Sequence, residues 1–223
     1  MTYRYDATYE EILELRDGSR LRLRQIRPSD KSALAMGFDQ LTAASRYDRF
    51  MGHKTELTED DLKYFTEVDG VDHFALAAFH IADSGQEEPI GTARFVRLRD
   101  HADVAEAAVT ILDAYQSRGI GTLLLERLLG AAWERDIRWF HFELFSRNVG
   151  MKHLIETVSH DEVKFAYQGS GCVTAQFRVP EPDRTSVIPA IEKDSPFRQM
   201  LRNLAKHRIV ARPRSTRPPP RPE

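Results

Sequence analysis

A short stretch from Gln116 to Gly121, QSRGIG, places small residues and no proline directly before a strongly helical segment. Each of its residues keeps a backbone N–H, and N–H groups at the start of a helix are donors that suit a phosphate. Gly119 and Gly121 permit backbone angles and a close approach that side chains would hinder. The helix dipole alone contributes about 0.3 to 1 kcal/mol per charge, so selectivity needs several N–H bonds and the guanidinium of Arg118. The stretch predicts a phosphate-binding loop, with a plain strand-to-helix turn as the alternative.

The loop does not match the two common nucleotide-binding patterns. A dinucleotide-binding loop needs glycine or alanine three residues after Gly121, where this chain has Leu124. A P-loop needs a lysine before its serine or threonine, but Thr122 follows Gly121 directly. Any phosphate held here therefore belongs to another kind of ligand.

The segments on either side of the loop predict a strand, a helix and a second strand. A strand ends near Leu112, a helix runs from about Gly119 to Arg135, and the apolar run WFHFELF at 139–145 forms the next strand. A helix that connects two neighbouring strands makes them parallel. The loop therefore lies at one end of a parallel strand pair, where a helix begins.

Other turn and cap signals predict antiparallel strands and further helices. The turn RDGS at 16–19 joins two strands, Ser29 is expected to cap one helix, and Thr58 and Asp61 form a capping box for another. The expected elements are strands at 12–15, 19–26, 73–81, 90–98, near Val163 and at 172–179, and helices at 27–41, at 57–68 and after Asn148. The predicted fold is α/β (α+β), a mixed, largely antiparallel central sheet flanked by helices in a single domain.

Composition and charge indicate how the chain is organised. The 223 residues are 41% hydrophobic and 30% charged, which is typical of one globular domain. We expect an N-terminal extension at 1–14, the domain at 15–180, and a basic, proline-rich tail at 181–223. The tail is either a solubilising end or a docking arm for a partner or an anionic surface. An amphipathic helix at 196–208 within it could dock on the domain, dimerise or lie on a membrane.

Net charge, cysteine count and the distribution of apolar residues argue against a nucleic-acid-binding, a secreted or a membrane-spanning protein. A net charge of -2 argues against nucleic-acid binding by the body of the chain. The single cysteine, the lack of an apolar signal core and the lack of a membrane-length apolar run predict a cytoplasmic location. Histidines and acidic residues at 141, 143, 153 and 160 form no metal-binding triad, so no metal is expected.

The loop and its surroundings resemble a known enzyme family. QSRGIG is similar to the Gln/Arg-x-x-Gly-x-Gly/Ala pyrophosphate loop of the GNAT acyltransferase superfamily, and the order of elements agrees with it over about 15–179. Four segments, at 15–30, 41–52, 68–78 and 105–128, resemble the acetyltransferase domain of bacterial protein lysine acetyltransferases. The resemblance implies a GNAT-like sheet, acetyl-CoA as donor and a primary amine as acceptor, above all a protein lysine.

The resemblance also implies roles for individual residues. It assigns the pyrophosphate to Gln116, Ser117, Arg118, Gly119, Ile120, Gly121 and Thr122. It assigns the pantetheine arm and the acetyl carbonyl to the backbone of Val109, Thr110 and Ile111, and places Asn148 near the pantetheine. Glu106 stands ten positions before Gln116, where the similar enzymes carry a general base.

Chemistry explains why a base is needed at Glu106. A lysine amine has a pKa near 10.4, so presenting it unprotonated at pH 7 costs about 4 to 5 kcal/mol unless a base takes the proton. Because Glu106 stands between Ala105 and Ala107, we expect an apolar site that raises the pKa of its carboxyl. The alternatives are a solvent-facing residue or an ion pair with Arg94 or Arg97.

Two further points remain open. The segment after Asn148 contains no tyrosine to protonate the leaving thiolate, so the general acid stays unassigned, and water could suffice. The enzyme could instead acetylate a small amine, or the chain could be a non-catalytic sensor that binds acyl-CoA. Loops within 37–54 are expected to determine the acceptor, and Tyr47, Asp48 and Glu67 near the entrance would suit a cation.

Overall fold

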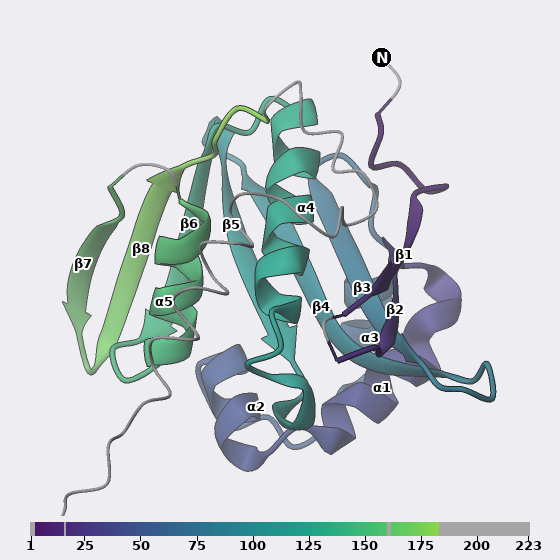
Figure 1. The fold of residues 1–223 in the computed structure, drawn as a ribbon. Helices are drawn as coiled ribbons and strands as arrows, with labels where there is room; N and C mark the ends of the chain where they lie inside the picture. Colours follow the sequence, from purple (N-terminus) through teal and green to yellow (C-terminus); the bar gives the residue numbers. More distant parts are fainter. Residues whose placement is uncertain (1–2, 16, 160–161, 183–223) are drawn as a thin grey trace, which may run out of the picture. The chain divides into compact units, whose positions relative to one another are not determined.

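The computed structural model describes residues 3–15, 17–159 and 162–182, which include an eight-stranded sheet. Its order is β1-β2-β3-β4-β5-β6-β8-β7 (Figure 1). The strands are β1 (Glu10–Glu14), β2 (Arg20–Gln25), β3 (His73–Ile81), β4 (Glu87–Leu98), β5 (His101–Ile111), β6 (Trp139–Phe145), β7 (Lys164–Gly169) and β8 (Cys172–Arg178). The helices are α1 (Lys31–Gln40), α2 (Ala43–Phe50), α3 (Glu59–Thr66), α4 (Ile120–Glu134) and α5 (Val149–Val158).

The strand directions confirm the predicted mixed sheet. Strands β1 to β5 pair with their neighbours in antiparallel fashion, and so do β6, β8 and β7. The β5–β6 pair is parallel, because α4 carries the chain back across the sheet between them. The predicted α/β class, with a largely antiparallel sheet flanked by helices, is therefore confirmed.

The two faces of the sheet are covered differently. In Figure 1, α4 lies in front of β3, β4 and β5, and α1 and α3 lie on the far side. The α4 face holds the large core, in which Leu124 and Leu128 pack against sheet residues such as Phe95 and Phe140. On the far face a smaller apolar cluster, Ile26, Ala75, Ala77 and Phe79, meets α1. The side chains of consecutive residues in each strand point to opposite faces of the sheet, so one strand contributes to both clusters.

Two local expectations are corrected by the structure, and a third is confirmed. The stretch around Ala43–Phe50, expected as loop, is the helix α2, because Thr42 caps it by accepting a bond from the Ser45 N–H at 3.2 Å. Ser29 does not cap α1. Instead a 3-10 turn at Pro28–Asp30 precedes that helix, and the Asp30 carboxylate accepts the Arg27 N–H at 2.8 Å. The Thr58 capping box of α3 is confirmed.

The N-terminal segment contributes to the sheet. Strand β1 lies within the range 1–14 that the sequence assigns to an extension, and it pairs with β2 along its whole length. The proposed helix at 196–208 and nearly all of the tail lie outside the described residues, so the domain boundaries stay predictions.

A buried ion pair attaches β1 to α4, and its loss should be costly. Arg127 is 4% exposed and donates two bonds to the Glu11 carboxylate, at 2.9 and 3.0 Å. We expect Arg127→Met to lower the free energy of unfolding by about 3 kcal/mol, because Glu11 then loses its counter-charge. Urea unfolding measures this change.

Arg22→Met is the matched control for that pair. Arg22 binds Glu10 of the same edge strand and Glu87, but its side chain is 25% exposed. Its removal should lower the free energy of unfolding by about 1 kcal/mol or less. Equal effects of the two substitutions would contradict the role given to the buried pair.

Candidate functional site

Strands β5 and β6 are paired over only part of their length. The parallel ladder joins Val104–Glu106 to Trp139–His141 and ends there, although β5 continues to Ile111 and β6 to Phe145. Beyond Glu106, β5 is bonded to β4 alone. The sheet is therefore open between these two strands, on the side that leads to the loop before α4.

The bonds at the ends of β5 show which backbone groups face the opening. The Asp103 carbonyl accepts the Arg138 N–H on the β6 side, and the Leu112 N–H donates to the Ile90 carbonyl on the β4 side. Since backbone direction alternates along a strand, Ala107, Val109 and Ile111 direct N–H and C=O groups toward β6. The backbone of Thr110 faces β4. Of the three residues assigned to the pantetheine, Val109 and Ile111 are thus placed to act through the backbone.

The QSRGIG loop has a backbone shaped for binding an anion. Ser117 has φ +61° and Gly119 has φ +84°, so two residues of the loop adopt a left-handed backbone before α4 begins at Ile120. The first N–H after the loop with a backbone acceptor is that of Leu123, which donates to Gly119. No helical or capping acceptor is recorded for the N–H groups of residues 117–122 in the described chain. This series of free donors is what a pyrophosphate requires.

The side chains of the loop have other contacts. Gln116 donates its amide to the Ile111 carbonyl at 3.2 Å, which connects the loop to the open edge of β5. Arg118 donates to the Ala114 carbonyl and lies 3.5 Å from the Asp17 carboxylate. A Cβ on Gly121 would lie 3.3 Å from Leu154 of α5, so this glycine permits close helix packing.

Asn148 caps α5 rather than projecting freely. Its side-chain oxygen accepts the Met151 N–H at 3.0 Å, which satisfies one of the free donors at the start of that helix. The amide nitrogen is the part of this side chain left for a ligand.

Glu106 is the last residue of β5 that pairs with β6, and its side chain lies on the face of the sheet opposite α4. Its side chain is exposed, whereas Ala105 and Ala107 point to the α4 core. The prediction that Glu106 has apolar surroundings is therefore wrong, because the side chains of consecutive strand residues point to opposite faces of the sheet. The ion-pair alternative is also wrong, since Arg97 pairs with Asp72 at 2.7 Å and Arg94 forms no salt bridge with any described residue.

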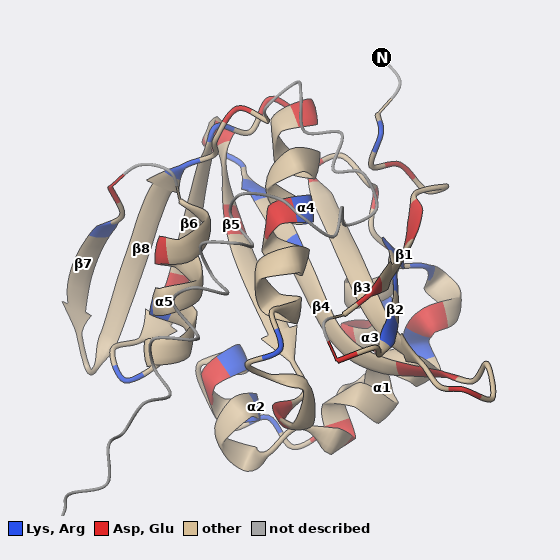
Figure 2. Cartoon of the chain, in the orientation of Figure 1, with Lys and Arg blue, Asp and Glu red and all other residues tan. Residues whose placement is uncertain are grey.

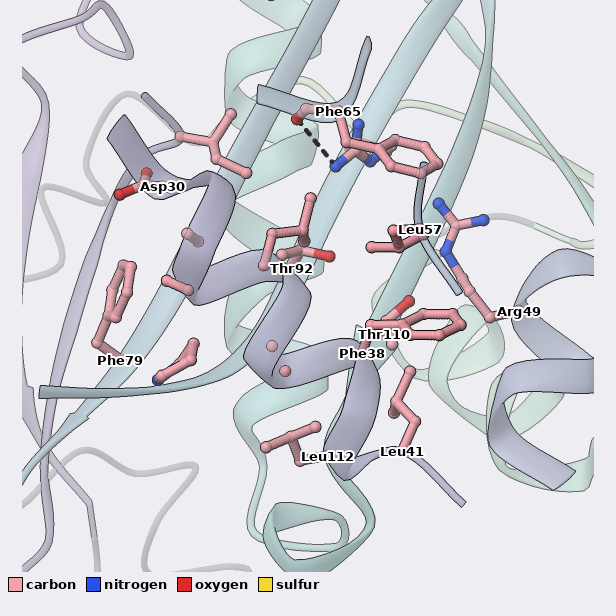
Figure 3. A pocket seen from close by; sticks show the side chains of 18 of the residues that line it. Asp30, Phe38, Leu41, Arg49, Leu57, Phe65, Phe79, Thr92, Thr110 and Leu112 are labelled. Carbon is pink, nitrogen blue, oxygen red and sulfur yellow. Dashed lines mark hydrogen bonds between the residues drawn. The ribbon is translucent and has the colours of Figure 1, made fainter. Parts of the chain in front are cut away.

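A pocket lies on the same face as Glu106, between the sheet and helices α1 to α3 (Figure 3). Leu34, Phe38, Leu57, Phe65 and Phe79 make most of its wall apolar. Thr110 and two arginines, Arg49 from α2 and Arg94 from β4, contribute polar groups. The dashed line in Figure 3 marks the 3.3 Å bond from Arg94 to the Phe65 carbonyl.

Sequence reasoning missed both arginines as pocket residues. The sequence suggested Arg94 only as an ion-pair partner for Glu106, and it suggested no role for Arg49. One signal was available, because Arg94 interrupts the apolar strand sequence ARFV. Arg49 could not be found in this way, since it reaches the site only when α2 packs against the sheet.

The electrostatics of the pocket follow from burial. Burial, and then the neighbouring Arg49, lower the pKa of Arg94 to about 9 against the opposing effect of Tyr64. Burial also lowers the pKa of Arg49, while the Glu106 carboxylate partly restores it. The Glu106 carboxylate therefore acts electrostatically on Arg49, which lines the pocket.

His73, which lies 3.2 Å from Arg94, should make stability depend on pH. Burial and then Arg94 lower its pKa from 6.5 to about 4, against the opposing effect of Asp69. The unfolded chain therefore binds the proton more tightly than the folded chain, and stability should fall as the pH drops from about 6.5 to 4. Urea unfolding at pH 7 and pH 5 should show a smaller loss for His73→Gln than for the wild type. An equal loss in both would contradict this.

The acidic entrance that the sequence predicts is only partly present. Asp48 forms a salt bridge with Arg147, and Tyr47 stacks on Phe145 of β6 at 5.2 Å. Glu67 binds Lys31 at 3.1 Å. Figure 2 shows acidic and basic residues mixed over the described helices and strands. Both acidic side chains that were expected to attract a cation, Asp48 and Glu67, thus already form salt bridges.

The described residues contain neither a cluster that could bind a metal ion nor a helix that could span a membrane. No group of three or more His, Cys, Asp and Glu side chains in the described ranges is arranged to hold a metal ion. None of the helices described above has the length and apolar character needed to cross a membrane.

Comparison with known proteins places this arrangement among acetyltransferases. Residues 20–158 match the family described as acetyltransferase (GNAT) domain. Acetyltransferase Pat of Mycolicibacterium smegmatis is 28% identical over 179 residues, which are 80% of this chain and 52% of Pat. An acetyltransferase of Pseudomonas aeruginosa is 26% identical over 143 residues, 64% of this chain and 76% of that protein. The chain thus spans about half the length of the mycobacterial relative.

A solved structure agrees with these sequence matches. The GNAT domain of PAT from S. lividans superposes with a TM-score of 0.68 and 32% identity. The match covers 78% of this chain and 99% of that domain.

Proposed function

Because the chain belongs to the GNAT acetyltransferase family, we propose that it transfers an acetyl group from acetyl-CoA to a primary amine, with protein lysine as the acceptor. The observation that carries the proposal is the open edge of β5 between Ala107 and Ile111. A chain with alternating amide groups, such as pantetheine, can bond to such an edge as a strand does.

The donor would lie along β5 with its pyrophosphate on the QSRGIG loop. The N–H groups of residues 117–122 have no acceptor among the described residues and lie at the start of α4, which also carries a partial positive charge. The bond from Gln116 to the Ile111 carbonyl holds the loop beside the strand edge. The N–H of Val109 is the group we assign to the acetyl carbonyl, where a donor stabilises the oxyanion formed on attack.

Glu106 would be the general base. It stands one residue before the open part of β5, on the face that also carries the pocket. Its exposed carboxylate is accessible to an ammonium arriving from solvent, directly or through a water. The neighbouring Arg49 is electrostatically coupled to it. After the proton is removed, the amine attacks the thioester carbon and the CoA thiolate leaves.

The leaving thiolate needs no residue of its own as acid. Its conjugate acid has a pKa near 8.5, so water can protonate it at neutral pH. Helix α5, which follows Asn148, carries no tyrosine. This assigns the protonation step to solvent.

Calorimetric titration with acetyl-CoA, followed by thiol release in the presence of lysine peptides, tests the proposal. We expect binding and an amine-dependent release of CoA. Binding without transfer to any peptide or small amine would favour a sensor that only binds acyl-CoA. Absence of binding would leave the loop as a strand-to-helix turn and overturn the proposal.

A further inference from the structure

The pocket beside Glu106 contains two buried polar atoms that have no hydrogen-bond partner among the described residues. They are Nε of Arg94 and the hydroxyl of Thr110, and both residues line the pocket. Arg94 is 5% exposed, so water does not replace the missing bond at its surface. A buried guanidinium nitrogen without an acceptor is costly, and such groups are usually paired.

No carboxylate of the described chain neutralises Arg94. Its other nitrogens contact the ring of His73 and the Phe65 carbonyl, which are uncharged partners. Asp30 also lines the pocket, but it forms a two-bond pair with Arg24, at 2.7 Å for each bond. Arg49 adds a second positive charge, and the carboxylate that acts on it most strongly among the described residues is that of the exposed Glu106.

We propose that this pocket binds a carboxylate carried on a short apolar stem, with Arg94 Nε and the Thr110 hydroxyl as its donors. A carboxylate forms short, charge-assisted bonds with a guanidinium and would supply the missing negative charge. The apolar wall around Phe38, Leu57 and Phe65 suits the stem.

The carboxylate can come from either substrate. Arg94 is paired across the strands with Ala108, next to Val109, where the proposed function puts the acetyl carbonyl. An acyl chain on CoA that ends in a carboxylate could therefore reach it, and so could an acceptor amine that carries one. Only this choice of source rests on the proposed function, because the pocket itself can bind a carboxylate without CoA.

Titration of the full chain with isovalerate and with isovaleramide tests the pocket directly. The two probes have the same shape and differ in charge. Isovalerate should bind wild type at least about tenfold more tightly than isovaleramide, since a hydrogen bond to a charged group is worth that much. In Arg94→Met the preference should disappear, while acetyl-CoA affinity stays within about twofold. Equal affinities in wild type, no binding of either probe, or a preference that persists in Arg94→Met would overturn the proposal.

A second variant guards against a folding defect in Arg94→Met. Thr110→Val removes only the hydroxyl and keeps the shape of the side chain, so the fold should be retained. It should reduce the preference for isovalerate by about fivefold. An unchanged preference would exclude the Thr110 hydroxyl from the site.

Two pairs of substrates then identify the source of the carboxylate. If it belongs to the donor, wild type should use succinyl-CoA in preference to butyryl-CoA, and Arg94→Met should lose this preference. If it belongs to the acceptor, leucine should be acetylated in preference to isoamylamine, with the same loss in the variant. If wild type turns over both members of each pair equally well, the pocket has no role in catalysis, while the proposed function stands. Failure to bind or turn over any acyl-CoA would refute the proposed function and leave the isovalerate result to decide the pocket.

Discussion

The substitution Gly119→Glu is expected to weaken acetyl-CoA binding by about 100-fold or more. Gly119 has φ +84° at the start of α4, beside N–H groups that have no acceptor in the part of the chain that the structure describes. A glutamate there would put a negative charge where the pyrophosphate is expected and would resist the left-handed backbone angle. No atom lies within 4 Å of a Cβ built on Gly119, so the fold should survive. Calorimetric titration with acetyl-CoA measures the effect.

Gly85→Glu is the matched control for that experiment. Gly85 has φ +83° and also no atom within 4 Å of a Cβ, but it lies in the turn between β3 and β4. The control therefore introduces the same charge and a similar backbone strain away from the loop. It should leave acetyl-CoA affinity unchanged. If both variants bind acetyl-CoA as wild type does, the QSRGIG loop is not the pyrophosphate site.

The second large effect is expected from Glu106→Gln. At pH 7 the variant should lower kcat by about 100- to 10,000-fold, because the amide cannot accept the proton of the acceptor ammonium. Acetyl-CoA affinity should not change, since the side chain points to the opposite face of the sheet from α4. The measurement is steady-state thiol release with a lysine peptide.

The pH dependence separates a base from a structural residue. As the pH rises toward the lysine pKa of about 10.4, the free amine becomes available without a base, so the variant should recover relative to wild type. Glu143→Gln is the control, because Glu143 is an exposed glutamate on β6. It should keep the activity of wild type. A fall in activity in this control equal to that of Glu106→Gln, or no recovery at high pH, would contradict the assignment.

Local patterns predicted the elements, and long-range pairing determined the site. Helical spacing after Gly119 and the capping box at Thr58 are properties of a few consecutive residues, so the sequence was sufficient for α4 and α3. The helix α2 was missed because its sequence, AASRYDRF, is polar and buries no residue fully. Its cap at Thr42 was the available signal.

The surroundings of Glu106 show what could not be predicted. Its two alanine neighbours suggested an apolar site, but strand alternation directs them to the other face. The opening between β5 and β6 depends on where their ladder ends, which no residue of β5 determines alone. The meeting of Arg49 and Arg94 depends on the packing of α2 and β4, which are far apart in the sequence.

The partial pairing of β5 and β6 also bears on solubility. Unpaired strand edges normally template aggregation, and proteins protect them with charges, bulges or covering segments. Here the edge that does not pair with β6, from Ala107 to Ile111, belongs to β5, which is an interior strand of the sheet. Strand β6 continues on the far side of the opening. A slender ligand can enter such an interrupted ladder, whereas a strand of another molecule would have to separate two halves of a folded sheet. The molecule thus keeps a row of free backbone groups for binding without presenting them at its rim.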